Sequence, residues 1–231
     1  PEKPELMREV SPHPFLPSDP ETLATRCWET FEIQSNALAT RIEAIGDTQL
    51  ILGVSGGIDS THALLACVAA LDLLGRDRSQ LHCITMPGLG TTVTTRSNAE
   101  TLCNVVGATF REIGVSELSH LVLSSIDHPA VDGTSSVDEL LNKLRQDPDL
   151  GNVALENVQA RLRTLVLMAL ANQLRGIVIG TGDLSEKALG WSTYSGDHIS
   201  MYDVNCGVPK TLIQFVIRWA ANERAGLWAD G

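Results

Sequence analysis

The chain has 231 residues, of which 43% are hydrophobic and 19% are charged, and this is the composition of a globular protein with one main core. Its formal net charge at pH 7 is −11, and its 17 lysines and arginines are spread along the sequence, so a nucleic acid is a poor candidate partner. No run approaches the roughly 18 apolar residues of a membrane span, and the cysteines occur singly, so we expect no membrane role and reduced thiols in the cytoplasm at Cys27, Cys67, Cys83, Cys103 and Cys206.

The N-terminal segment differs in composition from the rest of the chain. Residues 1–19 contain five prolines and predict an extended arm or linker. The stretch Ser18-Asp19-Pro20-Glu21 is a good helix N-cap with proline in the first turn, and it predicts a helix from Pro20 to Ala44. We therefore expect the main domain to occupy residues 20–231.

Strand patterns then alternate with helix patterns. Short apolar runs typical of buried strands lie at 50–54, 81–86, 109–113 and 177–180. Helical patterns occupy 61–74, 95–106, 154–175 and 210–222, whereas the polar residues 127–152 predict an excursion outside the core. This alternation predicts an α/β fold, a doubly wound parallel sheet with helices on both faces.

A glycine-rich loop connects the first predicted strand to its helix: Ser55, Gly56, Gly57, Ile58, Asp59 and Ser60. In an open parallel sheet, ligands bind at the carboxyl ends of the strands, and this loop leaves such an end. Glycines let the backbone approach an anion closely, and the free N–H groups of the first helical turn and the two hydroxyls can donate to it. The loop therefore predicts a phosphate-binding site.

The charge of Asp59 distinguishes this loop from two familiar phosphate loops. The pattern has no lysine of the G-x-x-x-x-G-K-[ST] type and does not match G-x-G-x-x-G. A carboxylate beside phosphate would repel it unless a cation lay between them, and Mg²⁺ bridging Asp59 and the phosphate is the simplest solution. The alternative is that Asp59 only caps the helix and the glycines only make a tight turn.

Several motifs together resemble one enzyme family. The stretch Ser55 to Ser60 resembles the SGG-x-DS signature of the PP-loop ATP pyrophosphatases, which cleave ATP between its α and β phosphates. Four further segments, in this order, resemble NAD synthetase, in particular the synthetase domain of bacterial glutamine-dependent forms. They are ENVQARLRT at 156–164, GTGDLSE at 180–186, GWSTY at 190–194 and VPKT at 208–211.

The resemblance implies an activity with its cofactors and partners. It implies synthesis of NAD⁺ by ATP-dependent amidation of nicotinic acid adenine dinucleotide through an adenylate, with release of AMP and pyrophosphate. It also implies Mg²⁺ as cofactor, ammonia supplied directly or by a glutaminase domain, and a homo-oligomer. We expect the chain to be a synthetase domain without its upstream glutaminase domain and its C-terminal extension.

The same resemblance assigns roles to individual residues. It implies catalytic roles for Asp59, Glu186 and Lys210, with Asp59 and Glu186 as Mg²⁺ ligands. ATP contacts are implied for the glycine-rich loop, Thr181 and Lys210. The residues implied to contact the substrate are Asn157, Arg161, Glu186, Trp191 and Asp197.

The positions of some of these residues also indicate their roles without the resemblance. Asn157 and Arg161 are four residues apart and share a helix face that could bind an anionic ligand, or could form a solvated stripe, which is our interpretation of Arg163. Lys210 begins a predicted helix, an unfavourable position for a cation unless an anion neutralises it.

Two residues have a plainer alternative. Glu186 could cap a helix or lie on the surface rather than bind a metal. Trp191 could fill the core rather than cover a substrate ring.

Two other classes of function compete with NAD synthesis. A tRNA-modifying or other amidating PP-loop enzyme would share the loop, but the acidic charge and the unpaired cysteines disfavour tRNA modification. A nucleotide-binding fragment would bind ATP without turnover.

Overall fold

The computed structural model describes residues 7–8, 10–11, 13–90 and 93–228. At its centre the described residues form a five-stranded parallel sheet in the order β3-β2-β1-β4-β5. The strands are β1 (Gln49–Gly53), β2 (Leu81–Thr85), β3 (Thr109–Glu112), β4 (Gly176–Gly180) and β5 (Tyr202–Asp203). The chain runs outward from β1 to β3 and then crosses to the other side of β1, so the order reverses between β1 and β4. In such a sheet this reversal is where ligands bind.

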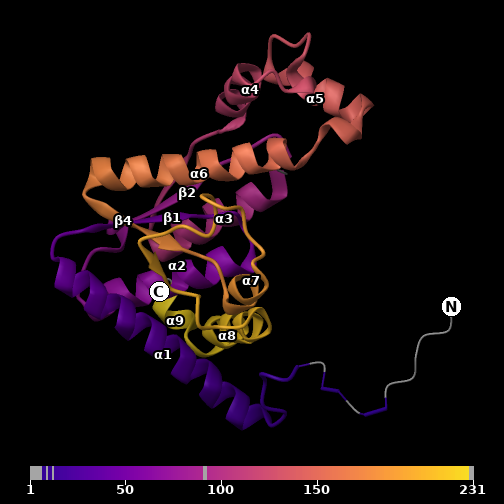
Figure 1. Cartoon of the computed structure of the whole chain (residues 1–231). Helices are drawn as coiled ribbons and strands as arrows, with labels where there is room; N and C mark the ends of the chain where they lie inside the picture. The colour runs from indigo at the N-terminus through magenta and orange to yellow at the C-terminus, as the bar shows by residue number, and fades with distance from the viewer. Residues whose placement is uncertain (1–6, 9, 12, 91–92, 229–231) are drawn as a thin grey trace.

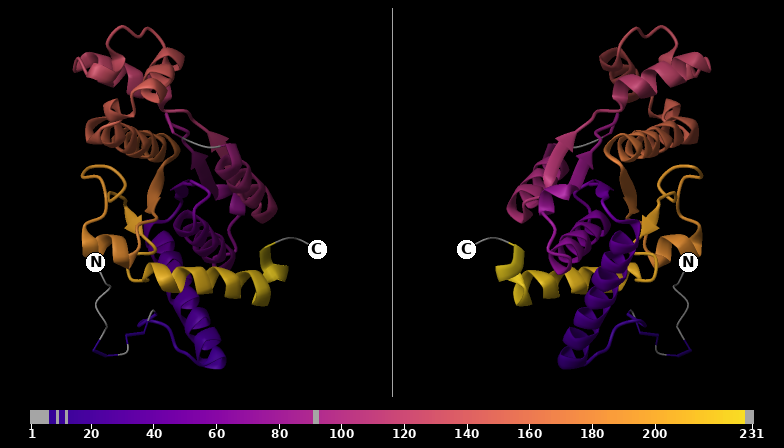
Figure 2. Two further views of the ribbon diagram at one scale, coloured as in Figure 1. Left: turned by 90° about the vertical axis from the view of Figure 1, so that its right-hand side faces the viewer. Right: turned by 90° about the vertical axis from the view of Figure 1, so that its left-hand side faces the viewer.

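Helices cover both faces of the sheet, as the sequence predicts (Figure 1). One face carries α1 (Pro20–Ile45), α2 (Ile58–Leu73), α3 (Val93–Val106) and α8 (Lys210–Glu223). The other face carries α6 (Val153–Leu174), and Figure 2 shows the sheet between α6 and α3. The predicted doubly wound α/β fold is confirmed.

Strand β1 shows why both faces need a cover. Side chains of a strand alternate between its two faces. Leu50 and Leu52 accordingly pack into the core beneath α2, whereas Ile51 packs into the core beneath α6. All three side chains are fully buried. The strand is apolar throughout because each of its two faces packs against a hydrophobic core.

The polar segment 127–152 lies outside the sheet and forms helical elements of its own. It follows α4 (Ser116–Ser125) and contains η2 (Pro129–Val131), α5 (Val137–Gln146) and η3 (Pro148–Leu150), which form the protrusion at the top of Figure 1. Leu123, Val131 and Leu140 bury themselves in a third, smaller core with Leu155 of α6. The segment is thus an excursion from the main core, as predicted, but it has a small core of its own.

Several short elements of the structure were not predicted from the sequence. These are α4, α5, α7 (Leu184–Leu189), α9 (Ala225–Trp228), β5, and the 3-10 helices η1 (Arg78–Gln80), η2 and η3. Among the described residues, no helix combines the length and the apolar character needed to cross a bilayer.

The described part of the N-terminal segment contacts the main domain. Leu16 packs against the core beneath α2, and the ring of His13 lies edge-on to Phe215 of α8, with 6.4 Å between the ring centroids. Pro1, Pro4 and Pro12 of the predicted arm lie outside the described residues.

Candidate functional site

A cavity of about 610 Å³ lies where the strand order reverses. Its lining includes Gly53 at the end of β1, Thr85 at the end of β2 and Gly180 at the end of β4. Helix α6 supplies a further wall through Ala160, Arg163, Thr164 and Leu167. The cavity therefore occupies the position at which a parallel sheet of this kind binds ligands.

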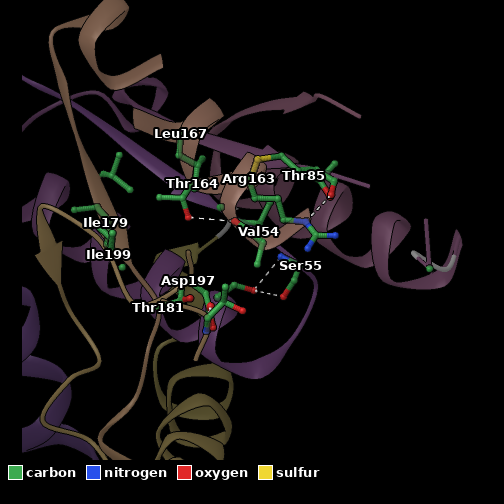
Figure 3. A pocket seen from close by; sticks show the side chains of 18 residues that line it. Val54, Ser55, Thr85, Arg163, Thr164, Leu167, Ile179, Thr181, Asp197 and Ile199 are labelled. Carbon is green, nitrogen blue, oxygen red and sulfur yellow. Dashed lines mark hydrogen bonds between the residues drawn. The ribbon is translucent and has the colours of Figure 1, made fainter. Parts of the chain in front are cut away.

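The glycine-rich loop forms one polar side of this cavity. Ser55 and Ser60 line it, and Figure 3 shows Ser55, Thr181 and Asp197 on its lower side with Thr164 and Leu167 above. Gly56 has a φ of +78°, a backbone conformation that a residue with a side chain rarely adopts. The Ser60 hydroxyl donates to the Gly57 carbonyl at 3.0 Å and accepts from the Ser55 N–H at 3.3 Å, so the loop is folded back on itself.

Asp59 lies in the first turn of α2 but does not cap this helix. The N-cap of α2 is Gly57, whose position has no capping side chain, and Asp59 is the second residue of the helix. The first-turn N–H groups of α2 are thus not occupied by a side-chain cap, as an anion-binding helix terminus requires. The alternative of a purely capping Asp59 is wrong.

Three carboxylates converge on one ammonium group beside the loop. Lys210 Nζ lies 2.7 Å from Glu186 Oε1, 3.1 Å from Asp59 Oδ2 and 3.1 Å from Asp183 Oδ2. Oxygen atoms of the three carboxylates lie within 4.8 Å of one another. We call Asp59, Asp183 and Glu186 the carboxylate cluster; with Lys210 its formal charge is −2.

Burial and charge determine the ionisation of this cluster. Burial raises the pKa of the Asp59 carboxyl, although Lys210 opposes this effect. Burial acts to lower the pKa of the Lys210 ammonium, but its hydrogen bonds with Glu186, Asp59 and Asp183 outweigh burial and raise that pKa. Lys210 is therefore protonated at neutral pH, and it holds together carboxylates that would otherwise repel one another.

Helix α7 positions two of the three carboxylates. Asp183 is its N-cap and accepts from the Glu186 N–H at 2.9 Å, and Glu186 Oε2 accepts in return from the Asp183 N–H at 3.3 Å. The other oxygen of Glu186 binds Lys210. Glu186 therefore caps a helix and belongs to the cluster at the same time, so the two interpretations from the sequence are not exclusive.

Asn205 links the segment that follows β1 to the segment that follows β4. Its buried side-chain amide donates to the Asp59 carbonyl at 2.9 Å and to the Thr181 carbonyl at 3.1 Å. One amide group thus fixes the start of α2 relative to the end of β4.

Asn157 and Arg161 share a helix face, as their spacing predicts, but they contact a loop and do not themselves line the cavity. Asn157 Oδ1 accepts from the Thr193 hydroxyl at 2.8 Å, and Arg161 Nε donates to the Tyr194 carbonyl at 3.0 Å. Both contacts hold the 190–201 loop against α6. Asn157 is half-buried, whereas Arg161 is exposed, so the alternative of a solvated stripe applies to Arg161 in spite of its hydrogen bond.

The 190–201 loop carries two of the predicted substrate contacts. Asp197 lines the cavity and accepts from the Thr193 N–H at 2.7 Å. Trp191 is 76% exposed, so the alternative that it fills the core is wrong. It is free to cover a ligand, but it does not line the cavity.

Arg163 is not the solvated residue that the sequence indicated. We expected it to be a solvated residue, but it is half-buried, lines the cavity, and donates through Nε to the Met86 carbonyl at 3.1 Å. Burial lowers the pKa of its guanidinium, and nearby Asp197 opposes that effect. No carboxylate among the described residues lies within ion-pair distance of it.

Other cavity and cluster residues were missed by the sequence analysis. Asp183 follows the predicted strand 177–180 and precedes Glu186 by three residues. This D-x-x-E spacing is the sequence signal of a capping box. Asn205 carries no comparable pattern, because its contacts join segments far apart in the sequence.

Comparison with known proteins gives consistent matches. Residues 31–218 match the family model described as NAD synthase. The chain is 47% identical over 215 residues to a glutamine-dependent NAD(+) synthetase of Mycobacterium leprae, covering 93% of this chain and 30% of that protein. The corresponding protein of Mycobacterium tuberculosis strain H37Rv is 46% identical with the same coverage, so the chain spans about three-tenths of the length of these relatives.

A solved structure supports the same relationship. The glutamine-dependent NAD⁺ synthetase of Acinetobacter baumannii, solved in complex with ADP, superposes with a TM-score of 0.70 at 25% identity. The superposition covers 85% of this chain and 33% of that one.

Proposed function

The chain belongs to the NAD synthase family, and from this premise we propose that it catalyses the ATP-dependent amidation of nicotinic acid adenine dinucleotide to NAD⁺. In this proposal AMP and pyrophosphate are released, and the reaction passes through an adenylate of the substrate carboxylate. The observation that carries the proposal is the carboxylate cluster with Lys210, beside a glycine-rich loop at the reversal point of the sheet.

The reaction needs activation of a carboxylate. A carboxylate is a poor electrophile without a leaving group, and transfer of AMP to it supplies one. Ammonia can then attack the acyl carbon and expel AMP. The chain's contribution is positioning and neutralisation of charge rather than covalent catalysis.

The cavity has the groups that ATP would require. The hydroxyls of Ser55 and Thr181 can donate to phosphate oxygens, and so can the uncapped N–H groups in the first turn of α2. The Ser60 hydroxyl could donate as well if it exchanged its bond to the Gly57 carbonyl for one to phosphate. The Acinetobacter baumannii relative was solved in complex with ADP, which supports an adenine nucleotide as a ligand of this kind of chain. Lys210, which begins α8, would neutralise phosphate charge from the other side.

The carboxylate cluster suits Mg²⁺ as a cofactor. Its donors are hard carboxylate oxygens, which Mg²⁺ prefers. Asp59 Oδ1 is buried and has no hydrogen-bond partner within the described part of the chain, so this oxygen is unsatisfied. The buried Asp183 Oδ2 has the ammonium of Lys210 beside it, at 3.1 Å. Asp59 and Glu186, with Asp183 beside them, would hold the ion. When bound, Mg²⁺ would neutralise the pyrophosphate leaving group.

The residues around the 190–201 loop would bind the dinucleotide acid. Asp197 lines the cavity, and Asn157 and Arg161 hold the loop that carries it. The exposed Trp191 would cover part of the substrate from this loop.

We extend the proposal to the protein's surroundings. Residues 20–231 would form the synthetase unit after the proline-rich arm, with ammonia supplied directly or by a glutaminase domain, and the unit would form a homo-oligomer. All five cysteines are free thiols and four of them are buried, which supports a reducing compartment such as the cytoplasm.

An assay of AMP release tests the proposal. The chain is incubated with Mg²⁺, ATP and nicotinic acid adenine dinucleotide, with ammonium or glutamine as nitrogen donor, and AMP, ADP and NAD⁺ are quantified. We expect AMP and NAD⁺ in equal amounts with ammonium. ADP and phosphate as products, or AMP release independent of the acid dinucleotide, would contradict the proposal.

A further inference from the structure

The turn that follows β2, residues 86–90, forms part of the cavity wall. Met86 and Gly90 both line the cavity. Met86 and Leu167 converge on Gly53: a side-chain Cβ at that glycine would lie 3.4 Å from Met86 Cε and 3.2 Å from Leu167 Cδ1. This side of the cavity is apolar, whereas the glycine-rich loop is polar. A flat base would occupy the apolar side, and phosphates the polar side.

Two side chains of α6 bind the backbone of this turn. Gln159 Oε1 accepts from the Leu89 N–H at 2.8 Å, and Arg163 Nε donates to the Met86 carbonyl at 3.1 Å. Gln159 is buried and is itself held by its amide, which donates to the Leu155 carbonyl at 3.3 Å. Residues four apart on a helix thus grip both ends of the turn.

The packing of Gly88 shows how closely the turn approaches α6. A Cβ added at Gly88 would lie 2.8 Å from Arg163 Nη2 and closer still to Gln159 Oε1. The φ of Gly88 is not in the left-handed region, so the contact with α6, and not the backbone conformation, requires glycine here. The side chain of Leu89 additionally packs against the third core.

We propose that Gln159 and Arg163 are positioning residues that clamp the 86–90 turn and thereby set the affinity of the cavity for the base end of the nucleotide. The inference rests on the proposed function, because it takes the ligand to be an adenine nucleotide. Loss of the clamp should weaken the binding of every ligand that carries the base. It should not change the binding of a ligand that consists only of phosphate groups.

Isothermal titration calorimetry of the 231-residue chain with Mg²⁺ tests this, using ATP, AMP and inorganic pyrophosphate as probes. The variants are Gln159→Leu and Arg163→Met, with Gln173→Leu at an exposed position of the same helix as control. We expect each clamp variant to lower the affinities for ATP and for AMP by a similar factor, about tenfold for one lost hydrogen bond. Pyrophosphate binding and the control variant should stay at the level of the unaltered chain. Gln159→Glu keeps the acceptor for Leu89 and should retain more affinity than Gln159→Leu.

Gly88→Ala gives an independent test, with Gly226→Ala, whose added Cβ would contact nothing within 4 Å, as control. Gly88→Ala should weaken AMP binding in the unaltered chain, but it should do so less in a Gln159→Ala background, because that background removes the closer of the two clashes and leaves only the one with Arg163 Nη2. Thermal melts verify that each variant is folded. Unchanged ATP and AMP affinities in folded clamp variants, or an equal loss for pyrophosphate, would overturn the inference alone. Absence of ATP and AMP binding by the unaltered chain would overturn the proposed function and this inference with it.

Discussion

Lys210 Nζ lies 3.1 Å from Oδ2 of Asp183, a residue with no exposed surface. A buried carboxylate is costly unless a cation or hydrogen bonds compensate it. Here the compensating ammonium comes from the first residue of another helix, and it also serves Asp59 and Glu186. The ammonium of Lys210 therefore keeps the three carboxylates close together beside the glycine-rich loop.

The first prediction concerns the two proposed metal ligands. Asp59→Asn and Glu186→Gln should each lower Mg²⁺-dependent turnover about 100-fold or more, because each removes a hard anion from the site of charge neutralisation. The double variant should lose much less than the product of the two single losses, since residues serving one ion act as a unit. Steady-state rates across a Mg²⁺ titration measure this, with thermal melts as the folding control. Full activity of Asp59→Asn at ordinary Mg²⁺ concentrations would contradict a metal bridge.

The second prediction concerns Lys210 and can be measured without turnover. Lys210→Met leaves the carboxylate cluster uncompensated, so its melting temperature should fall by several degrees in the absence of divalent ions. Added Mg²⁺ should raise the melting temperature of this variant more than that of the unaltered chain, because no ammonium competes for the oxygens. Lys187→Met, which removes the partner of Asp203 outside the cluster, is the matched control. Equal Mg²⁺ shifts in all three proteins would be evidence against the cluster as a cation site.

A third prediction follows from the linking role of Asn205. Asn205→Ala removes both hydrogen bonds that tie the Asp59 and Thr181 carbonyls together, and it leaves these carbonyls less satisfied. We expect a loss of about 1–3 kcal/mol in the free energy of unfolding and a larger relative loss of turnover. Urea denaturation and steady-state rates give the two quantities. The idea fails if stability falls while the activity of the folded fraction is unchanged.

A fourth prediction concerns the stability at acid pH. His62 of α2 has no exposed surface, stacks on Phe31 with 6.4 Å between ring centroids, and has no hydrogen-bond partner for either ring nitrogen within the described residues. Burial lowers its pKa to about 4, from 6.5 for an ordinary histidine. Between pH 6.5 and pH 4, His62 binds a proton in the unfolded chain but not in the folded chain. The contribution of neutral His62 to the free energy of unfolding is therefore fully present above pH 6.5 and is lost as the pH falls towards 4. The loss from this residue is about 3 kcal/mol.

His62→Leu should therefore lose less stability than the unaltered chain over that pH window. Urea denaturation at pH 7 and pH 4.5 measures the difference, and the exposed His13→Gln serves as control. The same pH dependence in His62→Leu and in the unaltered chain would refute the assignment.

Much of the sheet could be predicted because its strands are buried on both faces. The run Leu50 to Val54 is apolar throughout, and such runs alternating with helical patterns specify parallel strands with crossover helices. Strand β5, in contrast, is only two residues long, and α7 only six, so neither has a repeating pattern to read. Helix α5 was missed although Ser136 and Glu139 have the spacing of a helix start, because the prolines and glycines on either side of it favour a loop.

The site could be predicted only where a local motif carries it. The glycine-rich loop places Ser55, Asp59 and Ser60 by its own sequence. The environment of Arg163 could not be deduced in this way, because α6 lies between the sheet and further loops and has no single polar face. Helical spacing shows which residues share a face, but it does not show how many faces are covered.

The position of Leu89 has a consequence for how this protein can vary. Its backbone belongs to the turn that lines the cavity, whereas its side chain packs against the third core, with Leu123, Val131 and Leu140. The protruding segment of α4, η2 and α5 therefore supports the cavity wall from outside the sheet, although none of its helices lines the cavity. An engineered chain that shortens this protrusion would keep the sheet and the phosphate loop, but it would have to provide a new support for the turn.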